Sequence, residues 1–184
     1  MELRAPDPPL SDGDIRLVPV GPRHVPGLAS VARLPEVIAN TYVPSDAPAD
    51  FAERWVETYE QAWLDRSRAG FGIEDGSGAF LGLAGFVAPD LTARQAEAGY
   101  ILAPAARGRG VATRALGLLA GWGFGTLGLQ RIELRINDGN ASSEGVARRS
   151  GFRRDGVLRS VYFKEERRVD LGVWSRLPTD PPPA

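Results

Sequence analysis

The sequence predicts an α/β (α+β) protein in which helices lie on both faces of a mixed, mostly antiparallel sheet of six or seven strands. Its 184 residues, 43% hydrophobic and 24% charged, are sufficient for one domain with a buried core. A strand pattern, a glycine-rich turn, a helix pattern and a second strand pattern follow one another between residues 96 and 137. Such a unit places its two strands side by side and parallel, through a right-handed crossover. The remaining strands follow one another like hairpins, which predicts antiparallel neighbours.

The predicted domain covers residues 14–177, between a loosely ordered segment rich in Pro and Asp (residues 1–13) and a Pro-rich tail (residues 178–184). Residues 22–40 predict two short helices, because Pro26 and Pro35 interrupt the pattern. Longer helical patterns follow at residues 49–68 and 111–125, and a shorter one at 141–150. Strands are expected over residues 15–20, 70–75, 79–88, 95–103, 131–137, 151–160 and 168–177.

Composition excludes several classes of protein. A net charge of −1 argues against a general nucleic-acid-binding protein, and the chain has no cysteine for disulfides, thiolate metal sites or cysteine nucleophiles. The single histidine, His24, is expected at the surface, so we expect no metal. The sequence has neither an apolar run long enough for a membrane span nor a signal-peptide pattern, so we expect a cytoplasmic protein without a membrane partner.

The centre of the sequence is an Arg/Gly turn (Arg107-Gly108-Arg109-Gly110) that joins an apolar strand to a helix. The first N–H groups of a helix lack partners and carry partial positive charge, and glycines let a ligand approach the backbone. The turn therefore predicts a diphosphate site. The alternatives are a loop that needs glycines for its shape, or an Arg/Gly patch for nucleic acid. Residues 108–113 also approach the dinucleotide fingerprint, but Thr113 replaces its third glycine.

Four short motifs, in order and at matching spacing, resemble the GNAT superfamily of N-acetyltransferases, specifically its RimJ/RimL-like branch. The resemblance covers roughly residues 12–177 and implies the GNAT fold, with a splayed parallel strand pair at an acetyl-CoA site. The motifs are the strand Ala96-Glu97-Ala98-Gly99-Tyr100-Ile101-Leu102, the Arg-x-x-Gly-x-Ala signature at 107–112, Asn-x-x-Ser at 140–143, and Ala147-Arg148-Arg149-Ser150-Gly151-Phe152.

By this resemblance, backbone N–H groups of the turn and the helix start bind the pyrophosphate of coenzyme A. The N–H of about Leu102 is expected to face the thioester oxygen and stabilise the oxyanion. Asn140 matches an asparagine that contacts the cofactor arm, and it also suits a helix N-cap. The implied cofactor-binding residues are Leu102, Ala103, Arg107, Gly108, Arg109, Gly110, Val111, Ala112, Thr113, Asn140 and Ser143.

The resemblance implies an acetyl-CoA-dependent N-acetyltransferase in which an amine attacks the thioester directly. Glu97 is the candidate base, in an apolar setting expected to raise its pKa; the alternative is a solvent-facing carboxylate at a strand edge. Many members protonate the thiolate with a tyrosine, but the matching position here is Ala147. Ser143 is the expected replacement, with Ser142 or a water as alternatives, and Tyr100 is expected to pack rather than catalyse.

The expected acceptor is a protein N-terminal α-amine or a small-molecule amine, bound between the early helices and the last two strands. Glu165 and Glu166 are expected to attract a cationic amine or to remain solvated. The rival interpretation is a non-catalytic acyl-CoA-binding sensor on the same fold, and a homodimer is left open. The aromatic residues expected at the acceptor site are Tyr42, Trp55, Tyr59, Tyr162 and Phe163.

Overall fold

The computed structural model describes residues 3–164 and 167–182, except the side chains of residues 162–164. The strands are β1 (Leu10–Ser11), β2 (Ile15–Pro19), β3 (Ala69–Asp75), β4 (Phe80–Asp90), β5 (Gln95–Leu102), β6 (Arg131–Asn137), β7 (Arg153–Lys164) and β8 (Arg167–Arg176). The helices are α1 (Val25–Ala32), α2 (Pro35–Asn40), α3 (Phe51–Asp65), α4 (Val111–Gly125) and α5 (Ala141–Arg149). Two short 3-10 helices are η1 (Pro22–His24) and η2 (Pro104–Ala106).

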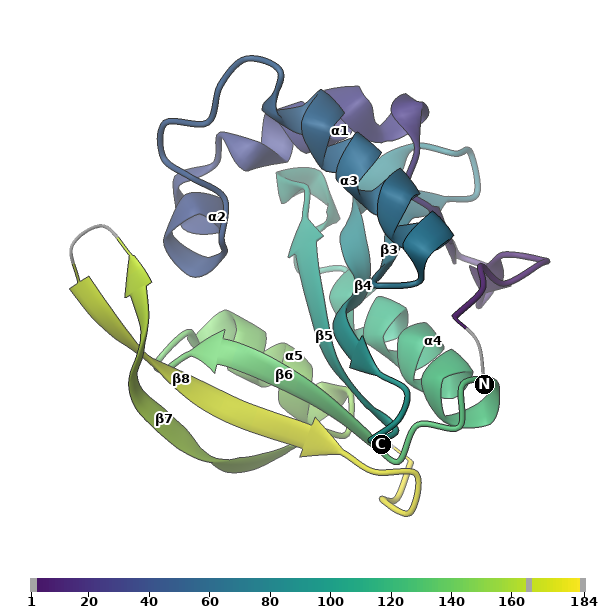
Figure 1. Cartoon of the computed structure of the whole chain (residues 1–184), viewed down its shortest axis with the longest axis vertical. Coiled ribbons are helices and arrows are strands. Elements are labelled where there is room, and N and C mark those ends of the chain that lie inside the picture. Colours follow the sequence, from purple (N-terminus) through teal and green to yellow (C-terminus); the bar gives the residue numbers. More distant parts are fainter. Residues whose placement is uncertain (1–2, 165–166, 183–184) are drawn as a thin grey trace.

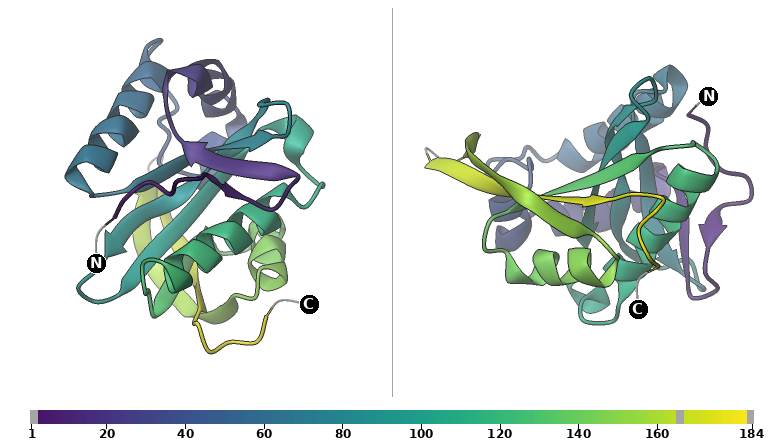
Figure 2. Two further views of the ribbon diagram at one scale, coloured as in Figure 1. Left: turned by 90° about the vertical axis from the view of Figure 1, so that its right-hand side faces the viewer. Right: turned by 90° about the horizontal axis from the view of Figure 1, so that it is seen from below.

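The strands form one mixed sheet in the order β1-β2-β3-β4-β5-β6-β8-β7, and all neighbours except β5 and β6 are antiparallel. Helices α4 and α5 contribute to the hydrophobic core on one face, whereas α1, α2 and α3 cover the other face (Figures 1 and 2). The predicted α/β class, with helices on both faces of a mostly antiparallel sheet, is confirmed. None of the helices in the described ranges has the length and apolar content that a membrane crossing requires.

The parallel pair, β5 and β6, is joined for only three residues at its beginning. Gln95 lies opposite Arg131, and the last pair is Glu97 with Glu133. Both strands continue beyond this point, β5 to Leu102 and β6 to Asn137, and there they diverge (Figure 1). The predicted splayed pair is therefore present, and its opening lies at the carboxyl ends of the two strands.

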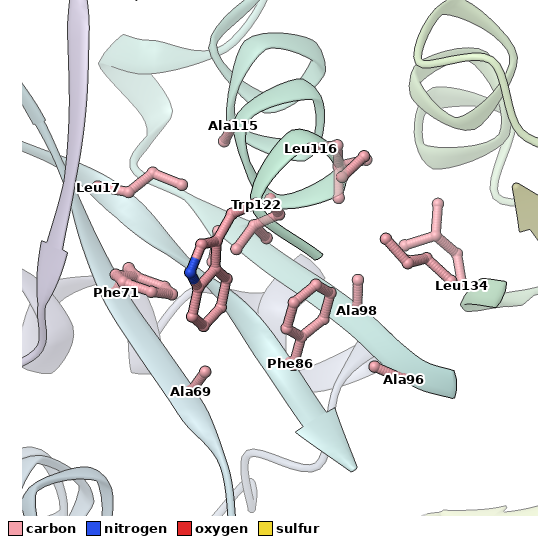
Figure 3. Close-up of a cluster of buried hydrophobic side chains, with 14 of the residues drawn as sticks. Leu17, Ala69, Phe71, Phe86, Ala96, Ala98, Ala115, Leu116, Trp122 and Leu134 are labelled. Atoms are coloured by element: carbon pink, nitrogen blue, oxygen red, sulfur yellow. The ribbon is translucent and has the colours of Figure 1, made fainter. Parts of the chain in front are cut away.

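Trp122 of α4 holds this helix against the sheet. Its ring stacks on Phe86 with centroids 5.7 Å apart and meets Phe71 edge-on at 5.5 Å (Figure 3). Aromatic pairs of this kind contribute about 0.5–1.5 kcal/mol beyond the burial of their area. The next residue, Gly123, packs so closely that an added Cβ would lie 3.0 Å from Phe86 and from Ile132. These contacts hold the C-terminal half of α4 against β3 and β4.

The start of the described chain adds a strand that the sequence did not predict. The sheet has eight strands instead of six or seven, because Leu10–Ser11 adds β1 to the edge of β2. Leu3 is 1% exposed, and Asp12 and Asp14 form ion pairs with Arg114 of α4. These long-range contacts attach residues 3–13 to the sheet and to α4.

The prediction that His24 lies at the surface is wrong. His24 is 2% exposed; its Nδ1 accepts the Gly21 N–H at 3.1 Å, so Nε2 carries the proton and donates to Glu74 at 3.1 Å. Burial lowers the pKa of His24, and nearby Arg23 lowers it further, whereas Glu74 opposes both. Glu74 is itself buried and is paired with Arg23 at 2.7 Å and with Arg16 at 3.2 Å.

Because the pKa of His24 is lower in the folded protein than in the unfolded chain, its neutral form stabilises the fold above about pH 6.5, and this stability is lost as the pH falls. Urea unfolding should therefore show a decrease in stability between about pH 7.5 and 5.5, above the range in which ordinary carboxylates titrate. His24→Gln should lower the stability at pH 7.5 but reduce this decrease. An equal pH dependence in both proteins would contradict the assignment, since the chain has no other histidine.

Candidate cofactor and active site

The Arg/Gly turn lies between the end of β5 and the start of α4. Gly108 and Gly110 have φ angles of +69° and +75°, which glycine adopts without the strain that a Cβ would cause. No atom lies within 4 Å of the position of an added Cβ at either residue, so the backbone is open to a ligand. Gly110 is the N-cap of α4, and the helix begins at Val111. The geometry thus presents the first N–H groups of a 15-residue helix at an open turn.

A cavity of about 170 Å³, here called the helix-start cavity, lies at this turn. The turn and α4 supply most of its lining, β5 contributes its last residue, and α5 closes the other side. Its only charged lining residue is Arg149, which the sequence analysis did not assign to the site. The lining residues are Leu102, Gly108, Gly110, Val111, Ala112, Thr113, Val146 and Arg149.

The two arginines of the turn do not line the helix-start cavity. Arg107 pairs with Glu36 of α2 and also donates to the Leu102 carbonyl at 3.2 Å. Its guanidinium lowers the pKa of Glu36. Arg109 donates to the Ala105 carbonyl at 3.4 Å. The cation that lines the cavity therefore comes from α5. The sequence carries only a weak indication of this role for Arg149, namely that it follows Val146 by three residues and so shares its helix face.

Glu97 lies at the point where β5 and β6 separate, in a second cavity of about 200 Å³. Its side chain is 23% exposed, and Arg135 Nε lies 3.4 Å from its carboxylate. Burial raises the pKa of Glu97, and the Glu133 charge raises it further, whereas Arg135 opposes them. The raised pKa agrees with the prediction, but the surroundings are charged rather than apolar. This Glu97 cavity is lined by Ala88, Gln95, Ala96, Glu97, Arg131, Glu133 and Arg135.

The backbone of Leu102 faces the opening between β5 and β6. The neighbouring Ala103 N–H donates to the Leu81 carbonyl of β4 at 2.9 Å. Because hydrogen-bonding direction alternates along a strand, the N–H and C=O of Leu102 point to the opposite side, toward β6. At this level β6 has already diverged. The expected oxyanion donor is thus directed into the opening, and Ala103 is directed away from it.

Asn140 and its neighbours begin α5 on the other side of the opening. Asn140 is the N-cap of α5 and accepts the Ser143 N–H at 3.2 Å, as the capping alternative predicted. Its side-chain amide donates to Asn40 of α2 at 3.0 Å. Ser142 is exposed and donates to the Asn140 side chain at 2.9 Å. These contacts leave Ser143, which is half-buried, as the hydroxyl that faces inward from the first turn of α5.

Tyr100 reaches from β5 toward Ser143. Burial raises the pKa of the Tyr100 phenol, while its hydrogen bond with Ser143 and the charge of Arg149 lower it. Tyr100 also packs against the core below α4, which agrees with its predicted packing role. Ala147 is completely buried, so the position that carries tyrosine in the resembling family faces the core here.

The aromatic residues expected at the acceptor site are only partly accounted for. Tyr59 is 7% exposed and packs over Gly70, so it belongs to the core of α1, α2 and α3 instead of an acceptor surface. Trp55 is half-buried, and Tyr42 is 76% exposed. The side chains of Tyr162 and Phe163, and the whole of Glu165 and Glu166, lie outside the described residues.

Residues 14–153 match the family described as "Acetyltransferase (GNAT) domain". The chain belongs to the GNAT acetyltransferase family. This membership confirms the resemblance that the motifs indicated, and with it the predicted enzyme class of acetyl-CoA-dependent N-acetyltransferase.

Similar proteins and solved structures agree with this assignment. The uncharacterized N-acetyltransferase YoaA of Bacillus subtilis is 28% identical over 121 residues, 65% of this chain and 68% of that protein. The crystal structure of spermidine N-acetyltransferase from Vibrio cholerae, in complex with CoA and spermine, matches with a TM-score of 0.80 at 20% identity. The match covers 92% of this chain and 98% of that one. RimL, a ribosomal L7/L12 alpha-N-protein acetyltransferase in complex with coenzyme A, also has a TM-score of 0.80, at 19% identity, covering 92% of this chain and 96% of RimL.

At these identities the solved structures establish the fold, and among the curated relatives the aligned segments cover 54–70% of the relatives' lengths. Coenzyme A, the expected co-substrate, is the ligand bound in both solved neighbours. The residues present here fit it, because an open glycine turn, a helix N-terminus and one arginine surround a single cavity.

Two glycines of α4 provide a matched test of the turn geometry. Gly110→Ala should lower the free energy of unfolding by about 1–2 kcal/mol, because its φ of +75° is unfavourable for any residue with a Cβ. Gly117→Ala should raise it by about 0.5–1 kcal/mol, because Gly117 lies exposed inside the helix with no atom near an added Cβ. Urea unfolding at neutral pH measures both. Effects of the same sign would contradict a conformational requirement at Gly110.

Proposed function

We propose that the protein transfers the acetyl group of acetyl-CoA to a primary amine by direct attack. The observation that carries the proposal is the opening between β5 and β6, with the helix-start cavity at its carboxyl end and the half-buried carboxyl of Glu97 at its closed end. A strand edge that has lost its partner offers backbone hydrogen bonds to an extended ligand. An acyl-CoA bound along β5 would lay its arm on the open strand edge while its phosphates remain at the turn.

In this proposal the N–H groups of the turn and of the first turn of α4 bind the pyrophosphate, and Arg149 supplies the cation. Thr113 lines the same cavity and adds a hydroxyl. Asn140 contacts the arm of the cofactor while it also caps α5, since an amide side chain has both donor and acceptor groups. The predicted cofactor residues that surround the helix-start cavity support this arrangement.

The reaction proceeds when the neutral amine nitrogen attacks the thioester carbonyl carbon. The N–H of Leu102 donates to the developing oxyanion, the carbon–sulfur bond breaks, and Ser143 donates a hydrogen bond or a proton to the thiolate. Glu97 takes the proton from the amine. Glu97 and Leu102 are five residues apart, roughly 16 Å along a strand, so this proton reaches Glu97 through a chain of several bridging waters.

The acceptor that suits such a base has a low pKa. At pH 7 an α-amine with a pKa near 8 costs roughly 1.4 kcal/mol to deprotonate, whereas a lysine side chain near 10.4 costs roughly 4.6 kcal/mol. A carboxylate that acts through water favours the smaller cost. We therefore propose a protein N-terminal α-amine or a small-molecule amine of low pKa. The RimL neighbour acts on a ribosomal-protein α-amine, the kind that this argument favours, whereas the spermidine N-acetyltransferase acts on an alkyl amine.

The test is a panel of amines and N-terminal peptides incubated with acetyl-CoA while free thiol is followed. We expect turnover with at least one α-amine, and Glu97→Gln should lower kcat/KM about 10²- to 10⁴-fold without changing CoA affinity. Tight CoA binding without turnover on any amine would contradict the enzyme and favour the acyl-CoA sensor. Full activity of Glu97→Gln would contradict the assignment of the base.

Two adjacent arginines on α5 test the proposed cation. Arg149→Gln should weaken CoA binding about tenfold, because it removes the one charged side chain that lines the helix-start cavity. Arg148→Gln is the control: Arg148 pairs with Glu144 at 3.1 Å and lies over the Trp174 ring, away from the cavity. Isothermal titration with CoA and with dephospho-CoA measures both variants and identifies which phosphate Arg149 meets. Equal affinities for the two variants would contradict the role of Arg149.

A further inference from the structure

A continuous row of opposite charges leads from β7 across β6 to Glu97. Arg131 lies 2.7 Å from Asp155 and 2.8 Å from Glu133. Arg135 lies 2.9 Å from the other carboxylate oxygen of Glu133 and 3.4 Å from Glu97. The β6 members of this row are Arg131, Glu133 and Arg135. They point to one face of the sheet, because the residues that alternate with them, Ile132, Leu134 and Ile136, are buried in the core on the other face.

We infer that Arg135, held in place by Glu133, is a positioning residue that keeps the Glu97 carboxyl in the ionised form that accepts a proton. The inference rests on the proposed function, in which Glu97 is the base. Arg135 is the only cation with an ion-pair distance to Glu97 among the described residues. It reaches Glu97 from the neighbouring strand, at the last residue pair before β5 and β6 separate.

Two opposing influences act on Glu97. Its partial burial and the nearby charge of Glu133 favour the protonated form, which cannot accept a proton from an amine. The positive charge of Arg135 favours the ionised form. The other groups at this site act on Arg135 or Glu133: Tyr42 interacts with Arg135, and Arg131 with Asp155 lies beyond Glu133.

Glu133 has two opposite effects on this balance. Its carboxylate accepts from Arg135 and fixes the guanidinium beside Glu97, yet its own negative charge disfavours ionisation of Glu97. Removing Glu133 therefore leaves Arg135 with Glu97 as its remaining carboxylate partner and eliminates the like charge. Removing Arg135 does the reverse, so the two substitutions should act in opposite directions.

The first experiment measures kcat/KM between about pH 5 and 9 with one accepted amine. In Arg135→Gln the acid limb should move to higher pH, so that activity near pH 6 falls roughly three- to tenfold relative to wild type and recovers near pH 9. In Glu133→Gln the limb should move to lower pH. The control Arg148→Gln, which removes an arginine that pairs with Glu144 and does not line the Glu97 cavity, should leave the limb in place.

An unchanged limb in Arg135→Gln, or shifts of the same sign in Arg135→Gln and Glu133→Gln, would overturn the inference, because a general structural disturbance affects both alike. A second readout needs no turnover: carboxyl ¹³C NMR of glutamate-labelled protein follows the titration of Glu97, whose signal is identified by its loss in Glu97→Gln. The titration midpoint should rise in Arg135→Gln and fall in Glu133→Gln. If the wild type turns over and these midpoints stay fixed, the proposed function stands and the role of Arg135 fails.

Discussion

The site depends on the early end of the parallel ladder between β5 and β6. A buried backbone N–H or C=O needs a partner, and a strand in the middle of a sheet normally has one on each side. After Glu97 and Glu133, β5 keeps β4 as its neighbour but loses β6. The row of backbone groups from there to the N–H of Leu102 is therefore available to an extended ligand, whereas the Leu102 carbonyl accepts from Arg107. The Arg/Gly turn follows directly where this row ends, so the phosphate-binding elements and the open strand edge are parts of one continuous segment.

Helix α2 connects the two sides of this opening. Glu36 at its start pairs with Arg107 of the turn, and Asn40 at its end accepts hydrogen bonds from Asn137 at 3.2 Å and from Asn140 at 3.0 Å. A six-residue helix has little stability of its own, because helix nucleation is costly. These contacts at both ends fix it in place. They also hold the ends of β5 and β6 at a defined separation, which an inserted cofactor arm requires.

Arginine serves three different purposes in this site, and the partner of each side chain decides which. Arg107 is satisfied by a carboxylate of α2 and a backbone carbonyl, so it joins structural elements. Arg149 lines the helix-start cavity, where an anion is the partner that its charge favours. Arg135 divides its charge between two carboxylates, and one of them is the proposed base. The net charge of −1 therefore gives no indication that the arginines of this site each have a specific partner.

Features that depend on residues close together in the chain could be predicted from the sequence. Alternation in residues 131–137 specified a strand with one charged face, the glycines of the turn specified an open helix start, and Pro26 and Pro35 divided the early helices. The order of these elements was sufficient for the fold class, because a strand, helix and strand unit has one favoured hand. Family motifs then indicated coenzyme A.

The contacts between residues far apart in the chain could not be predicted and come from the packing of the elements. His24 can be buried because Glu74, fifty residues away, accepts a hydrogen bond from its Nε2, and β1 forms because β2 offers an edge. Arg149 and the Arg/Gly turn line one cavity although a helix and a strand separate them in sequence. Arg135 and Glu97 likewise come from different strands. Local patterns carry no signal for such pairs, since packing between elements sets the distances on which burial and electrostatics depend.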